Sequence, residues 1–153
     1  MKIIDFVSIH TIIPALVSRD KDAALIELAA GLAAKYDQLD QQKVLGVLQE
    51  RERISSTAIG DGVAIPHGKL PGLERIYGVF ARSQEGVDFK SLDGEPTHLF
   101  FVLIAPENAA ADHLKALARI SRLLKDAGFR QRLMMGKDQQ ELFKLISEED
   151  DRF

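Results

Sequence analysis

The side chain best suited to carry out chemistry is the imidazole of His67. It lies in the stretch 56–68, which reads STAIGDGVAIPHG. An imidazole with a pKa near about 6.5 is mostly neutral at physiological pH, and a neutral ring nitrogen is a competent nucleophile. Gly68 has no side chain to shield the ring. The composition of the stretch alone nevertheless favours a plainer interpretation, an ordinary surface histidine in a loop.

The residues before His67 predict where it lies in the fold. Gly60 and Gly62 predict a turn, and the apolar run 63–65 predicts a short strand. Pro66 has a fixed φ and no N–H to donate to a neighbouring strand, so we expect it to stop the strand. His67 is then expected at a strand end with open access, where sites on α/β sheets usually lie.

His113 opens an apolar helical pattern and has two interpretations. A histidine at the edge of an apolar helix face is usually a hydrogen-bonded packing residue. Helix N-termini also bind anions, and this one would stabilise a phosphoryl group carried by His67. His98 and His10 are expected to be structural hydrogen-bonding residues. No pair of histidines has metal-ligand spacing such as i and i+4, so no metal site is predicted.

Four further polar residues precede the glycine-rich stretch and could contact an anion at His67. Arg51 and Arg53 either end a helix as solvated cations or supply one guanidinium that holds phosphate oxygens in a bidentate fork. The hydroxyls of Ser56 and Thr57 either donate to the same anion or only cap the turn. The residues themselves leave both pairs of alternatives open.

Known nucleotide-binding patterns do not fit the glycine-rich stretch. A dinucleotide fingerprint needs glycine where Ile65 stands, and a Walker loop needs four residues between its glycines where Gly62 and Gly68 leave five. The Gly-x-Ser-x-Gly elbow of serine hydrolases is also absent. The sequence therefore predicts no nucleotide or other cofactor.

Hydrophobic periodicity predicts alternating helices and strands around this stretch. The run 99–104 is almost continuously apolar, which indicates a central strand buried on both faces. The pattern predicts an α/β fold, a three-layer α/β/α sandwich with a mixed parallel and antiparallel sheet flanked by helices. Beyond 63–65, the expected strands are 75–83 and 97–106, and the expected helices are 21–36, one starting after Asp40, 110–126, about 129–135 and 138–148.

Composition excludes several classes of function. The net charge of −3 argues against a nucleic-acid surface, and the absence of cysteine excludes disulfides and thiol catalysis. No apolar run approaches a membrane span, and the N-terminus lacks a signal-peptide pattern, so a cytoplasmic protein without membrane contact is expected. The 153 residues are expected to form one domain, with an ordered core of about 3–148 and a frayed acidic end, EEDDRF.

Two segments resemble a known family. RERISSTAIGDGVAIPHGKL is similar to the active-site signature of the enzyme IIA (EIIA type-2) proteins of the fructose–mannitol class in the bacterial phosphotransferase system (PTS). APENAAADHLKALARISRLLKD resembles that family's second histidine segment, and the tail QELFKLI also matches in kind. The resemblance covers about residues 3 to 148.

The resemblance implies roles for particular residues. His67 would be phosphorylated through Nε2, with His113 as its companion histidine. Arg51, Ser56 and Thr57 match the family's phosphoryl-binding arginine, serine and threonine. Ser55 departs from the family, because relatives often have glycine there, so this turn is expected to differ locally. No metal is implied.

Within the family, the stretch IPHGKL and the single-domain chain look most like the nitrogen-regulatory (PtsN-like, enzyme IIA-Ntr) branch. Such a phosphocarrier accepts phosphate from an HPr-like donor and regulates partners, of the potassium-transport or sensor-kinase type, by its phosphorylation state. It is a carrier rather than a turnover enzyme on a small molecule. One alternative is a sugar-specific enzyme IIA that passes phosphate to a IIB component, and another is a regulatory binding module that is never phosphorylated. The retained His67 and His113 argue against the last.

Overall fold

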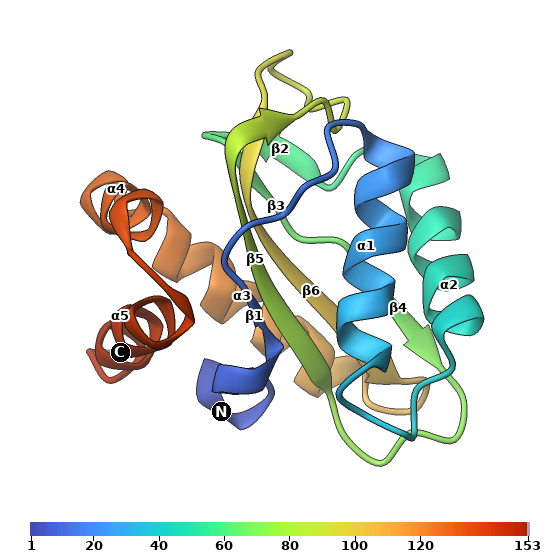
Figure 1. Cartoon of the computed structure of the whole chain (residues 1–153). Helices are drawn as coiled ribbons and strands as arrows, with labels where there is room; N and C mark the ends of the chain where they lie inside the picture. The colour runs from blue at the N-terminus through green and yellow to red at the C-terminus, as the bar shows by residue number, and fades with distance from the viewer. Residues whose placement is uncertain (153) are drawn as a thin grey trace.

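The middle layer of the molecule is one mixed sheet with helices on both faces (Figure 1). The computed structural model describes residues 1–152, and within them six strands pair in the order β1-β5-β6-β3-β2, with β4 also paired to β6. β5 and β6 are antiparallel, whereas β3 and β4 run parallel to β6. The strands are β1 (Ile12–Ile13), β2 (Ala58–Gly60), β3 (Val63–Ala64), β4 (His67–Leu70), β5 (Tyr77–Val87) and β6 (Thr97–Pro106).

Two groups of helices cover the two faces of this sheet. The first face carries α1 (Lys21–Ala33) and α2 (Gln41–Ile54). The second carries α3 (Ala110–Leu124), α4 (Ala127–Met135) and α5 (Gln139–Asp150), together with the short 3₁₀ helices η1 (Ile3–Asp5) and η2 (Ile9–Thr11). The predicted three-layer α/β/α sandwich is confirmed. No helix in residues 1–152 is both long enough and apolar enough to cross a bilayer.

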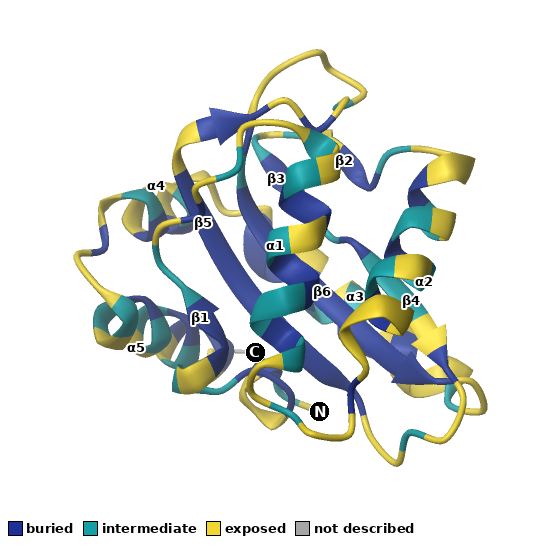
Figure 2. Ribbon diagram, turned by 45° about the vertical axis from the view of Figure 1, so that its right-hand side comes forward, coloured by how far each residue is buried: buried dark blue, intermediate teal, exposed yellow. Residues whose placement is uncertain are grey.

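The central strand β6 is buried along almost its whole length (Figure 2), and its residues contribute to both cores. Phe100, Val102 and Ile104 pack with α1 and α2, whereas Phe101 and Leu103 pack with α3, α4 and α5. Side chains of a strand alternate between faces, so a strand covered on both sides needs apolar residues at every position. The prediction from the run 99–104 is confirmed.

The strand before His67 ends ahead of Pro66, as predicted, but pairing with β6 resumes directly after the proline. Ala64 lies opposite Phe100 and His67 opposite Leu103, so β3 and β4 keep one offset along β6. The Pro66 carbonyl accepts a hydrogen bond from the Leu103 N–H (3.1 Å), which carries the chain across the interruption. His67 therefore stands at a strand end, as expected, but it is the first residue of β4, a strand that was not predicted. It lies on the same face as Leu103, which is the face of α3.

The turn before this strand is a tight hairpin between β2 and β3. Asp61 and Gly62 have φ angles of 59° and 72°, and positive φ at both central residues is typical of a type I′ turn. Aspartate followed by glycine is a preferred pair for this turn. The predicted turn is confirmed.

Aspartate is the N-cap residue of four of the five α-helices in residues 1–152. Asp20, Asp40, Asp126 and Asp138 accept backbone N–H groups at the starts of α1, α2, α4 and α5. α3 begins after Ala109, which offers no side-chain cap. Its first N–H groups therefore lack the partner that the other helices have.

Three expectations about the ends and edges need correction. The last helix continues to Asp150, and Glu149 and Asp150 are buried rather than frayed, while Phe153 lies outside the described residues. His10, expected to be a structural hydrogen-bonding residue, is exposed in the 3₁₀ helix η2. β5 runs four residues beyond the predicted end at 83.

Asp150 holds the end of the chain against α3 and η1. Its carboxylate accepts from the Arg119 guanidinium (2.6 Å) and from the Ile4 N–H (3.2 Å). We expect Asp150→Ala to lower the free energy of unfolding by about 3 kcal/mol, because Arg119 would lose its buried counter-charge. Urea unfolding measures this, with the exposed Glu148→Ala as a matched control. An equal effect of the two variants would show that this pair contributes nothing.

Candidate functional site

Both histidines singled out by the sequence line one open pocket of about 380 Å³. It lies between the start of β4, the end of α2 and the first half of α3. Three layers of the fold therefore contribute to it, although its residues are far apart in the chain. The lining residues are Arg51, His67, Gly68, Lys69, Ala110, His113, Leu114 and Leu117.

One backbone contact fixes the chemistry of His67. Its Nδ1 lies 2.8 Å from the Ile65 carbonyl oxygen, and a carbonyl can only accept, so Nδ1 carries the proton. Nε2 is then the nitrogen with the free lone pair. Burial lowers the pKa of His67, the charges of Arg51 and Lys69 lower it further, and the Ile65 carbonyl and Glu52 oppose them. The ring is therefore a neutral nucleophile at neutral pH, aimed through Nε2.

His113 faces His67 across the pocket. The two ring centroids are 5.3 Å apart with an interplanar angle of 81°. His113 is only 5% exposed, and its Nε2 is buried without a hydrogen-bond partner in residues 1–152. His113 packs at the edge of the apolar face of α3, as one of its two interpretations expected. The hydrogen bond that this interpretation also expected is not made at Nε2. A buried ring nitrogen without a partner costs about 1–3 kcal/mol, which a polar group in the pocket would recover.

The burial of His113 makes stability depend on pH. Burial, with smaller effects of His67 and Lys69, lowers the pKa of His113 to about 4. In the unfolded chain it is about 6.5, so between these values the unfolded state binds more protons and stability falls as the pH falls. From pH 7 to pH 5 we expect His113 to lower the free energy of unfolding by about 2 kcal/mol. Urea unfolding at both pH values measures this. Between pH 7 and pH 5, the free energy of unfolding of His113→Gln should fall by about 2 kcal/mol less than that of the native chain. Equal falls for the two proteins would contradict the low pKa of His113.

Of the two candidate arginines, only Arg51 lies at the pocket. Arg51 is in the last turn of α2, where its Nη1 donates to the Ser55 carbonyl (3.0 Å), and its side chain lines the pocket with His67. Arg53 pairs with Glu50 on the exposed side of the helix. Residues two apart on a helix point in different directions, so only one of them can face the histidines.

The structure does not bring Ser56 and Thr57 into the pocket. Ser56 Oγ donates to the Phe89 carbonyl (3.0 Å), and Thr57 Oγ1 donates to the Glu52 carboxylate (2.5 Å). Both hydroxyls therefore hold the segment between α2 and β2 in place. Their predicted contact with a phosphoryl group stays a prediction.

Comparison with known proteins identifies the family. The family described as "Phosphoenolpyruvate-dependent sugar phosphotransferase system, EIIA 2" matches residues 5–149. The chain belongs to this EIIA family. The resemblance of the two histidine segments is thereby confirmed, and membership supports a phosphocarrier role in the phosphotransferase system.

The relatives of this EIIA chain include regulatory and sugar-specific proteins. A nitrogen regulatory protein of Bradyrhizobium diazoefficiens is 49% identical over 96% of this chain and 95% of its own length. The fructose-specific EIIABC component of Bacillus subtilis is 36% identical over 98% of this chain but only 24% of its own length. The crystal structure of the nitrogen regulatory protein IIA-Ntr from Neisseria meningitidis superposes with a TM-score of 0.86 at 30% identity, over 93% of this chain and 97% of that one. The likeness to the nitrogen-regulatory branch is confirmed.

Two charged residues that act on His67 in this EIIA chain were not predicted from the sequence, Lys69 in the pocket and Glu52 outside it. Lys69 lines the pocket because it is two residues after His67 on β4, a spacing that keeps both side chains on one face. Glu52 is buried and accepts from Lys21 (2.9 Å) and from the N–H and hydroxyl of Thr57. The burial of Glu52 could have been predicted, because it follows Val44 and Leu48 on the buried face of α2, one helical turn after Leu48.

Gly68 has a packing role that the sequence did not reveal. A Cβ at this position would lie 2.8 Å from Cγ2 of Val47 in α2. The glycine therefore lets α2 approach β4 closely, which brings Arg51 at the end of that helix to the same pocket as His67.

Proposed function

We propose that this chain is a phosphocarrier of the nitrogen-related phosphotransferase system, phosphorylated on His67 by an HPr-like donor, and that its phosphorylation state regulates partner proteins. The observation that carries the proposal is the hydrogen bond from His67 Nδ1 to the Ile65 carbonyl (2.8 Å). It leaves Nε2 as a neutral nucleophile inside a pocket that also holds His113, Arg51 and Lys69.

In the proposed transfer, the lone pair of His67 Nε2 attacks the phosphorus atom of the donor's phosphohistidine. The new N–P bond forms as the donor's N–P bond breaks, and the electron pair of the broken bond stays on the donor imidazole. No proton has to move, because Nδ1–H remains bonded to the Ile65 carbonyl throughout. That carbonyl stabilises the positive charge that the His67 ring gains. The N–P bond remains reactive, so the phosphoryl group can be passed on.

The surroundings supply positioning and positive charge, which phosphoryl transfer needs most. Arg51 and Lys69 are the cations that line the pocket. Ala110, in the uncapped first turn of α3, lines it too, so backbone N–H groups and the positive end of the helix dipole lie nearby. His113 Nε2, without a partner in residues 1–152, would gain one in a phosphoryl oxygen.

The regulatory output follows from the charge that phosphorylation adds. A phosphoryl group brings about −1.5 to −2 of charge to a surface that includes Leu114, which is 67% exposed. A partner that docks on apolar surface in one state then meets a desolvation and charge penalty in the other. Partners of the potassium-transport or sensor-kinase type fit this scheme, and the likeness to a nitrogen regulatory protein supports it.

The proposal is tested by intact-mass spectrometry after incubation with phosphoenolpyruvate, enzyme I, and either HPr or its nitrogen-branch counterpart. We expect one acid-labile phosphoryl group, added faster from the nitrogen-branch donor. No addition from either donor would overturn the carrier role and leave a regulatory binding module. Faster addition from HPr would overturn the choice of branch.

A sugar-specific enzyme IIA is the second candidate, favoured by the 36% identity to a fructose-specific EIIABC component. Such a protein would pass its phosphoryl group to a IIB component. The two candidates differ in the acceptor: adding fructose-type or mannitol-type IIB to the phosphorylated chain should leave the group on His67 in a regulatory carrier. Rapid loss to either IIB would favour the sugar-specific function.

A further inference from the structure

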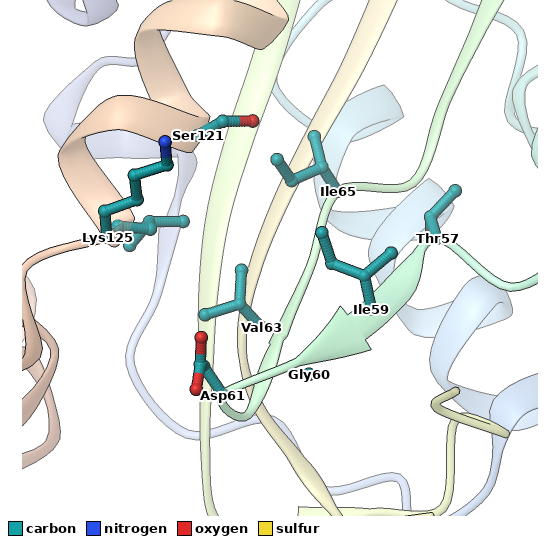
Figure 3. A pocket seen from close by; sticks show the side chains of 9 residues that line it. Thr57, Ile59, Gly60, Asp61, Val63, Ile65, Ser121 and Lys125 are labelled. Carbon is teal, nitrogen blue, oxygen red and sulfur yellow. The ribbon is translucent and has the colours of Figure 1, made fainter. Parts of the chain in front are cut away.

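A second pocket has a volume of about 200 Å³ (Figure 3). It lies one turn of α3 beyond the histidine pocket, since Leu117 lines the first pocket and Ser121 the second. The β2–β3 hairpin forms one wall and the second half of α3 forms the other. No residue of this pocket lines the histidine pocket. Its lining residues are Thr57, Ile59, Gly60, Asp61, Val63, Ile65, Ser121, Leu124 and Lys125.

The walls of this pocket are mostly aliphatic. Ile59, Val63 and Ile65 project from the hairpin side (Figure 3). Leu124, the last residue of α3, lines the opposite side. Ile59 is 71% exposed, although a side chain of this size normally gains about 1.5–3 kcal/mol from burial. The pocket therefore offers apolar surface that a ligand could cover.

One end of the pocket has an unmatched positive charge. Lys125 has no ion-pair partner in residues 1–152, and Ser121 is one turn before it on the same side of α3. The carboxylate of Asp61 is 4.0 Å from the Arg130 guanidinium, so its charge is already opposed. Charge complementarity at the Lys125 end therefore favours an anion.

Size narrows the class of ligand. A cavity of about 150 Å³ holds benzene, so about 200 Å³ suits roughly six to eight non-hydrogen atoms. We propose that this pocket binds a short aliphatic carboxylate, with its chain against Ile59, Val63 and Ile65 and its carboxylate on Lys125 and Ser121. This site lies outside the phosphoryl-transfer machinery.

The pocket shares a backbone segment with the histidine site. The Ile65 side chain lines it, while the Ile65 carbonyl accepts the Nδ1–H of His67 (2.8 Å). The Ile65 N–H bonds to the carbonyl of Thr57, another lining residue (3.4 Å). A ligand against Ile65 therefore acts on the group that orients the His67 ring. Control of phosphorylation by the ligand rests on the proposed function. Binding of the ligand to the pocket does not depend on that function.

Binding is tested on the unphosphorylated chain by NMR of isoleucine methyl groups, with hexanoate as the probe. We expect saturable shifts of Ile59 and Ile65 with a dissociation constant on the order of 1 mM, typical of a ligand of about eight non-hydrogen atoms. Lys125→Gln should weaken binding about threefold to tenfold, whereas Lys115→Gln, an exposed lysine on the same helix, should not. Absence of saturable shifts would overturn the site.

The uncharged hexanamide separates charge recognition from apolar burial. We expect it to bind about threefold to tenfold more weakly than hexanoate, and equally weakly to the native chain and Lys125→Gln. Equal affinity of hexanoate and hexanamide for the native chain would overturn the assignment of a carboxylate ligand.

Coupling is read from the ring nitrogen shifts of His67 in the same hexanoate titration. We expect them to move along the same saturation curve as the Ile65 methyl group, and no movement would overturn the coupling. Neither the isoleucine methyl shifts nor the His67 nitrogen shifts require phosphorylation. Both results can therefore be interpreted even if the chain is not a phosphocarrier. If the chain is a carrier, linkage requires phosphorylation to change hexanoate affinity by the same factor as hexanoate changes the phosphorylation equilibrium.

Discussion

His67→Gln is expected to take up no phosphoryl group, whichever phosphohistidine donor is offered. Glutamine keeps a hydrogen-bonding side chain of similar reach, but its amide nitrogen has no basic lone pair and cannot form the N–P bond. His113 is not expected to replace His67, because it is only 5% exposed whereas His67 is partly exposed. Intact-mass spectrometry at neutral pH, with the native chain run in parallel, measures the result.

Matched controls separate loss of the nucleophile from loss of the fold. His98→Gln removes a histidine of the same sheet whose Nδ1 bonds to the Ser83 carbonyl (2.8 Å), and it should leave phosphorylation unchanged. The urea midpoint of His67→Gln should stay close to that of the native chain at pH 7, because His67 is only partly buried. An acid-labile phosphoryl group on His67→Gln would show that another histidine is the nucleophile.

The layers of the fold could be predicted because they depend on local patterns. The apolar run of β6, the 3.6-residue spacing of the helices, and Asp40 before α2 each depend only on residues close to them in the sequence. His98 is a similar case, since its expected structural hydrogen bond is made.

One strand near His67, β4, was not predicted, and the reason is physical. Pro66 cannot donate to a neighbouring strand, so the local pattern predicts a stop there and no strand directly after it. Parallel pairing with β6 needs only the Pro66 carbonyl at that point, and the carbonyl is free to accept from Leu103. Whether a partner strand is present is a long-range property, which no local pattern around Pro66 contains.

The burial of Glu149 and Asp150 could not be predicted for the same reason. Glu149 and Asp150 look like solvated acids at a chain end, because carboxylates are seldom fully buried without a partner. The partner of Asp150 is Arg119, which is 31 residues earlier in the sequence. The hydrogen bonds of the Ser56 and Thr57 hydroxyls to the Phe89 carbonyl and the Glu52 carboxylate also depend on the tertiary fold.

The choice between Arg51 and Arg53 leads to the second large effect. We expect Arg51→Gln to slow phosphoryl transfer to His67 about 10²-fold, because removing one preorganised donor to a developing charge typically costs that much. Arg53→Gln should change the rate less than about twofold, since Arg53 pairs with Glu50 outside the pocket. Quenched-flow transfer from the phosphorylated donor, followed at several donor concentrations, measures both.

The concentration dependence shows what Arg51 contributes. If Arg51 stabilises charge in the transition state, the loss persists at saturating donor; if it only helps the donor to dock, the loss disappears there. Arg51→Lys keeps the charge but not the planar fork, so partial recovery would indicate that charge matters more than bidentate geometry. Equal rates for Arg51→Gln and Arg53→Gln would contradict the role of Arg51. Lys69, two residues after His67 in β4, would then be the remaining cation at the pocket able to stabilise the transferring group.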